Sequence, residues 1–359
     1  MIGRKGKVLV GMSGGVDSSV SAGLLLEEGY EVIGAFMKNW SGGVLGPRCT
    51  DPEQIGDAFS ECDWRAERRD ALRAAATLGI PFLTFDFETE YRRDVVEHMF
   101  REFQAGRTPN PDVLCNKFVK FDLFVKEADK LGCDFVATGH YARIKNGRIL
   151  TGSDPNKDQT YFLWAIPPAI LSRVLFPVGG MLKPDVRKKA HELGLAVADK
   201  KDSTGICFVG DVDIRAFLKE RIPEDPGDIV TTNGEVVGRH EGIAFYTIGQ
   251  RHGLNVGGGT PYYVVEKRPM TKQLVVSSNF HPALFKKELT AKDCNWFRKS
   301  TGSCQARIRY RQPPAACTVF EEPDNRVRVV FDEPQRAVTP GQSIVFYDGE
   351  EMLGGGIIE

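Results

Sequence analysis

Residues 9–20 read LVGMSGGVDSSV, and this stretch decides how the first part of the chain is expected to fold. It places two adjacent glycines, an aspartate and three serines directly after a short apolar strand. A glycine-rich turn between a strand and a helix presents backbone N–H groups beside the positive end of the helix dipole, which favours a phosphate. The stretch therefore predicts a phosphate-binding loop in an α/β sheet.

Two common phosphate-binding loops do not fit this stretch. A Walker loop needs a lysine after its last glycine, but Gly15 is followed by Val16-Asp17-Ser18. The dinucleotide fingerprint fails on its glycine spacing. The stretch resembles the SGGxDS pyrophosphate loop of enzymes that cleave ATP between the α and β phosphates. The alternative is a glycine turn that only lets the helix pack on its strand.

Composition is ordinary for a well-cored soluble protein: 359 residues, 42% hydrophobic and 26% charged. This length predicts two or three domains. No apolar run of about 18 residues and no signal-peptide pattern is present, so a cytoplasmic location is expected. The net charge of −1 does not favour a nucleic-acid partner, but residues 282–311 hold eight Lys or Arg against two acids.

Strand and helix patterns alternate in the first half, which predicts a doubly wound parallel sheet with ligands at the carboxyl ends of its strands. Gly11, Met37 and Gly139 lie at such ends. From about residue 214 the sequence becomes rich in short strands, which predicts two small β-rich domains, the last a β-barrel. The expected domains span residues 1–210, 211–278 and 279–359. The expected strands are 7–12, 31–37, 81–87 and 134–139, and the expected helices are 18–28, 62–78, 89–104 and one ending near 131.

The eight cysteines include no C-x-x-C pair, which argues against a disulfide scaffold and a zinc ribbon. Cys115 lies in TPNPDVLCNKFVKF (108–121), at an expected helix start whose dipole would favour its thiolate. Cys207 lies in DKKDSTGICFVGD (199–211). Either could be an inert core residue. Beside an AMP-forming loop, however, a persulfide on one cysteine could displace AMP and a second cysteine could release the sulfur.

Several motifs in order make the chain similar to the bacterial tRNA-specific 2-thiouridylase (MnmA) family over essentially its whole length. They are GMSGGVDSS, TPNPDVLCNKFVKF, ATGHYA, KDQTYFL, STGICF and a late GQ. The resemblance implies that the ATP phosphates bind Gly11, Met12, Ser13, Gly14, Gly15, Val16, Asp17 and Ser18, with Met37 and Gly139 at the adenosine.

The resemblance also implies the tRNA contacts. Asn110, Pro111 and Asp112 would meet the flipped target uridine, with His140 beside it. Lys157, Asp158, Gln159, Arg309, Tyr310 and Gln342 would bind the rest of the tRNA. From the residues themselves, RIRYR predicts a strand with Arg307, Arg309 and Arg311 on one face, suited to phosphates. A solvated basic edge strand is the alternative.

The implied reaction is ATP-dependent sulfur transfer to C2 of the wobble uridine, U34, giving 2-thiouridine, AMP and pyrophosphate. Cys207 would carry the persulfide, Cys115 would be the nucleophile that leaves a transient Cys115–Cys207 disulfide, and Asp112 would assist proton movement. The expected cofactors and partners are ATP, Mg²⁺, tRNAs for Lys, Glu and Gln, and a sulfur-relay protein or cysteine desulfurase.

Three rivals remain open at this point. One is an amide-forming ligase with a small substrate. Another keeps the tRNA but makes Cys115, Cys207 and Asp112 ligands of an iron–sulfur cluster. The third is a non-catalytic tRNA-binding module, which would leave the nucleotide loop unexplained.

Overall fold

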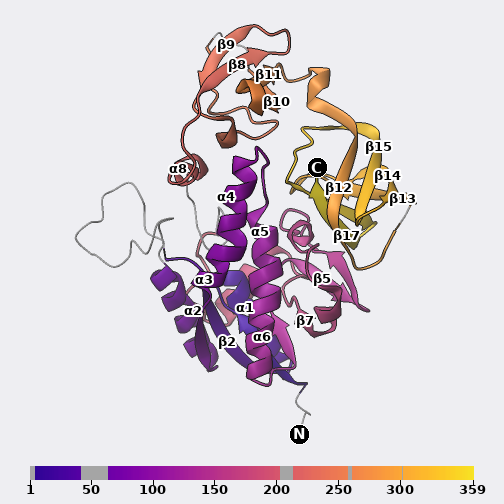
Figure 1. The fold of residues 1–359 in the computed structure, drawn as a ribbon. Helices are drawn as coiled ribbons and strands as arrows, with labels where there is room; N and C mark the ends of the chain where they lie inside the picture. The colour runs from indigo at the N-terminus through magenta and orange to yellow at the C-terminus, as the bar shows by residue number, and fades with distance from the viewer. Residues whose placement is uncertain (1–4, 42–63, 203–212, 258–260, 301) are drawn as a thin grey trace, which may run out of the picture. The chain divides into compact units, whose positions relative to one another are not determined.

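A computed structural model describes residues 5–41, 64–202, 213–257, 261–300 and 302–359 (Figure 1). The chain divides into two compact units. The first comprises residues 1–96, 111–212 and 350–352, and the second comprises residues 97–110, 213–349 and 353–359.

The first unit is built on a five-stranded sheet in the order β3-β2-β1-β4-β7, with parallel pairing throughout. In the central strand, Val8, Leu9 and Val10 are fully buried, as expected where helices cover both faces of a parallel sheet. This confirms the predicted doubly wound sheet. Its strands are β1 (Lys7–Gly11), β2 (Glu31–Lys38), β3 (Phe82–Asp86), β4 (Phe135–Ala137) and β7 (Val174–Leu175).

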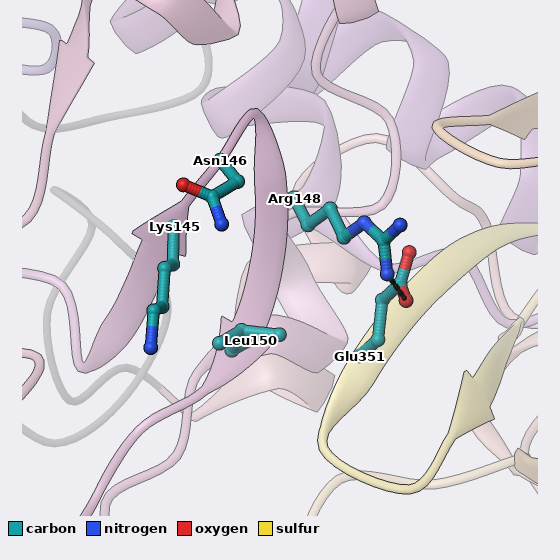
Figure 2. Close-up of a pocket in the computed structure, with 5 residues that line it drawn as sticks. All are labelled: Lys145, Asn146, Arg148, Leu150 and Glu351. Atoms are coloured by element: carbon teal, nitrogen blue, oxygen red, sulfur yellow. Dashed lines mark hydrogen bonds and ion pairs between the residues drawn. The ribbon is translucent and has the colours of Figure 1, made fainter.

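A hairpin of β5 (Ala142–Lys145) and β6 (Arg148–Thr151) follows β4 in the same unit. Residues 351 and 352 pair with β6 in antiparallel register. An open groove of about 380 Å³ lies at this hairpin (Figure 2). Its lining includes an ion pair between Arg148 and Glu351, 3.2 Å apart, and contains none of the residues expected to bind ATP or tRNA.

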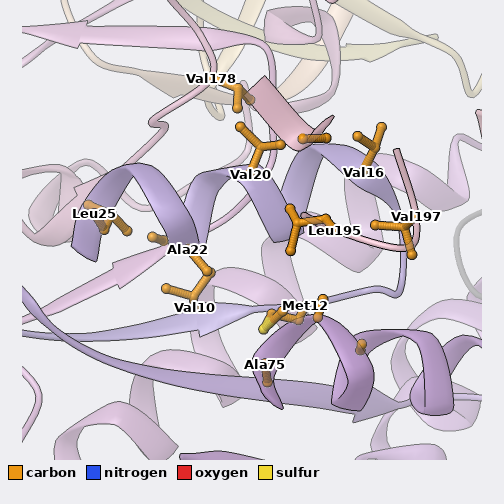
Figure 3. Packing of buried hydrophobic residues seen from close by; sticks show 14 of the residues in the cluster. Val10, Met12, Val16, Val20, Ala22, Leu25, Ala75, Val178, Leu195 and Val197 are labelled. Atoms are coloured by element: carbon orange, nitrogen blue, oxygen red, sulfur yellow. The ribbon is translucent and has the colours of Figure 1, made fainter. Parts of the chain in front are cut away.

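One face of the sheet packs on helices α1 (Val16–Glu27), α2 (Trp64–Leu78) and α7 (Lys183–Glu192). Figure 3 shows this core, which includes Val20 and Leu25 of α1, Ala75 of α2 and Val10 of the sheet. On the other face, the ring of Phe124 in α6 (Phe124–Lys130) meets Phe85 of β3, with ring centroids 6.2 Å apart. The two faces are thus held by separate apolar layers.

The chain from residue 88 to residue 130 is almost wholly helical, interrupted by the loop that carries Asn110. The helices are α3 (Glu88–Tyr91), η2 (Arg92–Val96), α4 (Glu97–Gln104), α5 (Pro111–Leu114), η3 (Cys115–Leu123) and α6. Among these, α4 belongs to the second unit, and the first unit also contains the short helices η4 (Thr160–Phe162) and η5 (Pro168–Arg173). No described helix is long and apolar enough to cross a membrane.

The second unit contains two β structures, which confirms the predicted pair of β-rich regions ending in a barrel. A four-stranded sheet has the order β10-β11-β8-β9. In the barrel the order is β12-β15-β14-β13-β16-β17, and pairing of β12 with β17 closes it. Closure removes the exposed sheet edges. Its core includes Val329, Phe346 and Leu353, all fully buried.

The elements of these two β structures have the following bounds. The sheet strands are β8 (Gly227–Thr231), β9 (Val236–His240), β10 (Tyr263–Arg268) and β11 (Gln273–Ser277). The barrel strands are β12 (Phe285–Trp296), β13 (Gly302–Arg307), β14 (Ala315–Glu322), β15 (Arg326–Arg336), β16 (Ser343–Asp348) and β17 (Glu351–Ile358). The described helices between and before them are α8 (Ile214–Lys219), η6 (Ile243–Phe245), η7 (Pro269–Thr271) and η8 (Pro282–Leu284).

Candidate nucleotide site and cysteine loop

The loop between β1 and α1 is shaped by its glycines and serines. Gly14 has φ +79°, and a Cβ there would lie 2.3 Å from the carbonyl oxygen of Glu67, so a larger residue does not fit. The Ser18 hydroxyl donates to the Gly15 carbonyl (3.2 Å) and accepts from the Ser13 N–H (3.2 Å). The loop is therefore closed upon the first turn of the helix, where unpaired backbone N–H groups favour an anion.

The residues expected to bind ATP lie together at the carboxyl ends of neighbouring strands. A Cβ on Gly139 would lie 2.6 Å from the backbone nitrogen of Ser18, so the chain after β4 packs directly on the start of α1. A Cβ on Gly11 would lie 3.0 Å from Cε of Met37. These approaches bring the ends of β1, β2 and β4 to one edge of the sheet, where ligands of doubly wound folds bind.

Two residues that the sequence did not single out hold Asp17 of the loop. The hydroxyl of Tyr141 donates to Oδ1 of Asp17 over 2.7 Å, and Nζ of Lys183 lies 2.6 Å from the same oxygen. A third, Lys200, donates to the Gly14 carbonyl (3.0 Å) and to Asp70 (2.8 Å). Their separations along the chain, up to 186 residues, hide this grouping from motif analysis.

Asp202 lies among three cationic groups. Its carboxylate is 2.6 Å from Lys157, 2.9 Å from Lys183 and 2.8 Å from Arg187. Burial by itself raises the pKa of Asp202, but hydrogen bonds from Lys157 and Lys183 outweigh it and lower the pKa to about 2. Asp202 is therefore a carboxylate at any physiological pH.

Another residue missed by the sequence analysis is Asn39, which follows β2. Its side chain is buried, with 1% of the residue exposed. Neither of its amide atoms has a hydrogen-bond partner among the described residues. Met37, two residues earlier, is expected at the adenosine because of the family resemblance. The pattern MKNW does not show whether the amide of Asn39 is buried without a partner or is solvated.

Cys115 is fully buried at the start of η3, and the expectation of a thiolate stabilised by a helix start is wrong for this conformation. Burial raises the pKa of its thiol to about 12, helped by nearby Asp112 and opposed by Lys120. The physical reason is that the helical turn begins at Pro111, so Cys115 lies past the turn where the dipole acts. Cys207 lies outside the described residues.

His140 is also buried and packs between the rings of Phe121 and Phe176. Its Nδ1 is 2.7 Å from the Thr138 hydroxyl and its Nε2 is 3.5 Å from Nζ of Lys120. Burial, together with Lys120, lowers the pKa of His140 well below its usual value. The imidazole is thus neutral, and in this conformation it offers no charge to a tRNA.

The expected tRNA residues 157–159 make contacts inside the first unit. Lys157 is paired with Asp202, as described above. A carboxylate oxygen of Asp158 accepts from the Gly152 N–H (3.2 Å) and the Thr160 hydroxyl (2.9 Å), and Gln159 accepts from the Tyr141 N–H (2.9 Å). The last two side chains shape the turn, so their oxygens are engaged before any RNA arrives.

The predicted strand over RIRYR is wrong beyond its first residue. β13 ends at Arg307, and Arg311 has a left-handed backbone with φ +64°, so Arg307, Arg309 and Arg311 do not alternate on one strand. Arg309 donates through Nη2 to the Ile248 carbonyl (2.8 Å), the Ala337 carbonyl (3.2 Å) and the Thr339 hydroxyl (3.1 Å).

Tyr310 and Gln342 also lie in the second unit. The guanidinium of Arg311 stands over the Tyr310 ring, 5.2 Å from its centre. Nε2 of Gln342 donates to the Thr108 carbonyl (2.9 Å) and the Pro109 carbonyl (3.2 Å). Gln342 therefore stabilises the segment that precedes Asn110.

No three His, Cys, Asp or Glu side chains gather as a metal site among the residues that the structure describes. One expected ligand of the iron–sulfur alternative, Cys207, lies outside them. That alternative therefore stays a prediction.

Family models match almost the whole chain. A tRNA methyl transferase HUP domain matches residues 6–211, a tRNA methyl transferase PRC-barrel domain matches residues 215–278, and an aminomethyltransferase beta-barrel domain matches residues 286–358. These matches agree with a parallel sheet followed by two β structures.

Curated relatives are similar over their full length. The chain is 49% identical to tRNA-specific 2-thiouridylase MnmA 2 of Geobacillus kaustophilus, covering 98% of this chain and 94% of that one. It is 50% identical to tRNA-specific 2-thiouridylase MnmA of Hahella chejuensis, covering 99% and 98%. A solved 4-thiouridine synthetase–RNA complex with bound ATP is 18% identical, covers 57% of this chain and 46% of that one, and has a TM-score of 0.35, too low for a functional comparison. With a family model on its first 200 residues and relatives half identical from end to end, the protein belongs to the tRNA-specific 2-thiouridylase MnmA family.

Proposed function

We propose that this protein is a tRNA-uridine 2-sulfurtransferase that uses ATP to adenylate the C2 oxygen of the wobble uridine, U34. Sulfur then replaces AMP, giving 2-thiouridine, AMP and pyrophosphate. Family membership supports the substrate and the product. The observation that carries the nucleotide step is the packing of Gly139 on Ser18, which gathers the loop and the strand ends at one edge.

In the adenylation step, the backbone N–H groups at the start of α1 would stabilise the leaving pyrophosphate. Asn110, Pro111 and Asp112 would receive the uridine, which must leave its stack before C2 can be reached. Asp112 would assist proton movement on the base. Magnesium would neutralise phosphate charge when bound, and the Asp17 carboxylate is a hard oxygen donor of the kind that this ion prefers.

In the sulfur step, the terminal sulfur of a Cys207 persulfide would attack C2 and expel AMP, which leaves a disulfide bond between Cys207 and the base. Cys115 would then attack the Cys207 sulfur and release the thiolated base as it forms the Cys115–Cys207 disulfide. The transferred sulfur is reduced and the two protein thiols are oxidised, so an external thiol must reduce the disulfide after each turnover.

This sequence requires a change around Cys115. A buried thiol with a raised pKa is a poor nucleophile, because the thiolate is the attacking form. We infer that tRNA binding, which brings the uridine to Asp112 three residues away, changes the surroundings of Cys115.

The proposed partners are tRNAs for Lys, Glu and Gln, and a sulfur-relay protein or cysteine desulfurase that loads Cys207. Residues 1–210 would adenylate and transfer sulfur, residues 211–278 would form the central β-rich domain, and residues 279–359 would bind tRNA. The proposed place of action is the cytoplasm.

The test is incubation of the protein with tRNA, ATP and a sulfide source, followed by analysis of nucleotides and of nucleosides by mass. Formation of AMP, pyrophosphate and 2-thiouridine only when tRNA is present supports the proposal. ADP formed in step with product would contradict it. Pyrophosphate release that does not depend on tRNA would favour a ligase for a small substrate.

A further inference from the structure

Lys183 bridges two carboxylates beside the nucleotide loop. Its Nζ lies 2.6 Å from Oδ1 of Asp17 and 2.9 Å from Oδ1 of Asp202. Only 10% of its side chain is exposed, so water competes weakly for the ammonium group. Lys183 is the first residue of α7, and its N–H donates to a carboxylate oxygen of Asp154 over 3.1 Å. Both the backbone and the ammonium group of Lys183 are therefore held in position.

The lysine separates charges that would otherwise repel each other. Asp17 and Asp202 both approach the same ammonium group, and their mutual repulsion is offset while it lies between them. Asp17 keeps a second donor, Tyr141, on the same oxygen, whereas Asp202 keeps Lys157 and Arg187. Loss of Lys183 would leave both carboxylates in place but remove the group that fixes the distance between them.

The bridge also connects two parts of the proposed reaction. Asp17 is the second residue of α1 and belongs to the nucleotide loop. Lys157, at the other end of the chain of ion pairs, is one of the residues that the resemblance assigns to tRNA contact. Asp202 joins the two ends, because it accepts both Lys157 and Lys183.

We propose that Lys183 is a positioning residue for uridine adenylation, which holds Asp17 at the nucleotide loop and links it through Asp202 to Lys157. This inference rests on the proposed ATP-dependent function. Lys183 acts through Asp17, so its loss slows the adenylation step more than it weakens ATP binding.

The experiment compares Lys183→Met, Lys183→Arg, Asp17→Asn and the double variant Asp17→Asn/Lys183→Met. Lys188→Met on the exposed side of the same helix is the matched control. The measurements are the rate of tRNA-dependent pyrophosphate release at saturating substrates, the KM for ATP and the melting temperature.

We expect Lys183→Met to lower the rate by about 100-fold while the KM for ATP changes by less than about 3-fold. Lys183→Arg should recover at least about 10-fold of that loss, because a guanidinium can reach both carboxylates. The double variant should be no slower than the slower single variant, since both changes remove the same interaction.

Two results would overturn the inference while leaving the proposed function intact. One is a Lys183→Met rate equal to that of Lys188→Met at an unchanged melting temperature. The other is losses that multiply in the double variant, which would mean that Lys183 and Asp17 act independently. If Lys183→Met does not fold, the rate of pyrophosphate release by Asp202→Asn provides the test. We expect this rate to fall by about 10-fold, and a wild-type rate would contradict the inference. A wild-type enzyme that forms no AMP would instead contradict the proposed function.

Discussion

Tyr141 donates its phenolic hydrogen to Oδ1 of Asp17 over 2.7 Å, although 124 residues separate them along the chain. Burial, followed by the charge of Asp17, raises the pKa of Tyr141, so the phenol stays protonated and keeps donating. We expect Tyr141→Phe to lower the rate of pyrophosphate release by about 10-fold. The free energy of unfolding should fall by about 1 kcal/mol, the usual net value of one hydrogen bond.

The control for this change is Tyr263→Phe in the second unit, whose ring meets Arg336 rather than the loop. The rates of pyrophosphate release by both variants, measured with tRNA and ATP at saturation, separate an effect at Asp17 from a general effect of removing a tyrosine hydroxyl. Equal rates in Tyr141→Phe and wild type would show that Asp17 needs no donor from Tyr141.

Asp202 gives a pH dependence of stability with a defined sign. Its pKa is about 2 in the folded protein, below its ordinary value of 3.8, because the hydrogen bonds from Lys157 and Lys183 outweigh the effect of burial. The stabilisation is therefore complete above pH 3.8 and is lost as the pH falls towards 2. It amounts to at most about 2 kcal/mol, less after allowance for the partly exposed carboxylate.

Denaturant unfolding between pH 3 and pH 6, compared with Asp202→Asn, measures this contribution. The difference in unfolding free energy between wild type and variant should shrink as the pH falls. A difference that stays constant across this range would show that Asp202 does not keep its low pKa.

Cys115 should resist alkylation in the protein without tRNA. Its side chain is buried and its thiol has a pKa of about 12, so little thiolate exists at pH 8. We expect iodoacetamide at pH 8 to label Cys115 at least about 10-fold more slowly than the partly exposed Cys304, as followed by peptide mass. Addition of tRNA should speed the labelling of Cys115, and rapid labelling without tRNA would contradict the buried conformation.

Arg309 is expected to serve both stability and tRNA binding. Its three hydrogen bonds join the segments at 248 and 337–339, so Arg309→Ala should lower the melting temperature. If it also meets a phosphate, the slope of tRNA affinity against salt should flatten by about one contact. Arg268→Gln is the control, because this exposed arginine of β10 lies outside the expected tRNA contacts. A lower melting temperature with an unchanged salt slope would give Arg309 a structural role alone.

The sequence predicted the parallel sheet because each strand of the first half is a short apolar run followed by a helical pattern. The spacing of the glycines predicted a phosphate-binding loop at the end of β1. Gly139 lies close to this loop because β4 pairs with β1. The partners of Asp17 could not be predicted, since Tyr141 and Lys183 reach it only after the chain has folded. A lysine in KPDVRKK looks like any other lysine on a charged helix.

Two local predictions failed for the same reason, which is that the tertiary structure overrode a short pattern. RIRYR alternates like a strand, but the chain turns after Arg307. Cys115 stands near a proline-bounded helix start, but the packing of η3 buries it. In both cases the residue types indicated the possible chemistry, but the tertiary contacts around them could not be predicted from the sequence.

In the proposed reaction, Cys207 carries sulfur as a persulfide and Cys115 releases it. The most direct test loads the protein from a protein sulfur donor and measures persulfide on the Cys207 peptide and 2-thiouridine in the tRNA, both by mass. Cys207→Ser should still form AMP but no 2-thiouridine, because a hydroxyl cannot hold the sulfur. Cys115→Ser should accept the sulfur and stall at its release.

The matched controls are Cys294→Ser and Cys317→Ser, which should remain active. The peptides joined by a disulfide must be identified, because Sγ of Cys317 lies only 3.7 Å from Sγ of Cys304 and this pair could also be oxidised. We expect a Cys115–Cys207 disulfide to form in step with 2-thiouridine. A Cys207→Ser enzyme that thiolates tRNA at the wild-type rate would contradict it, and a bound iron cluster lost in either active-site variant together with activity would favour the cluster alternative.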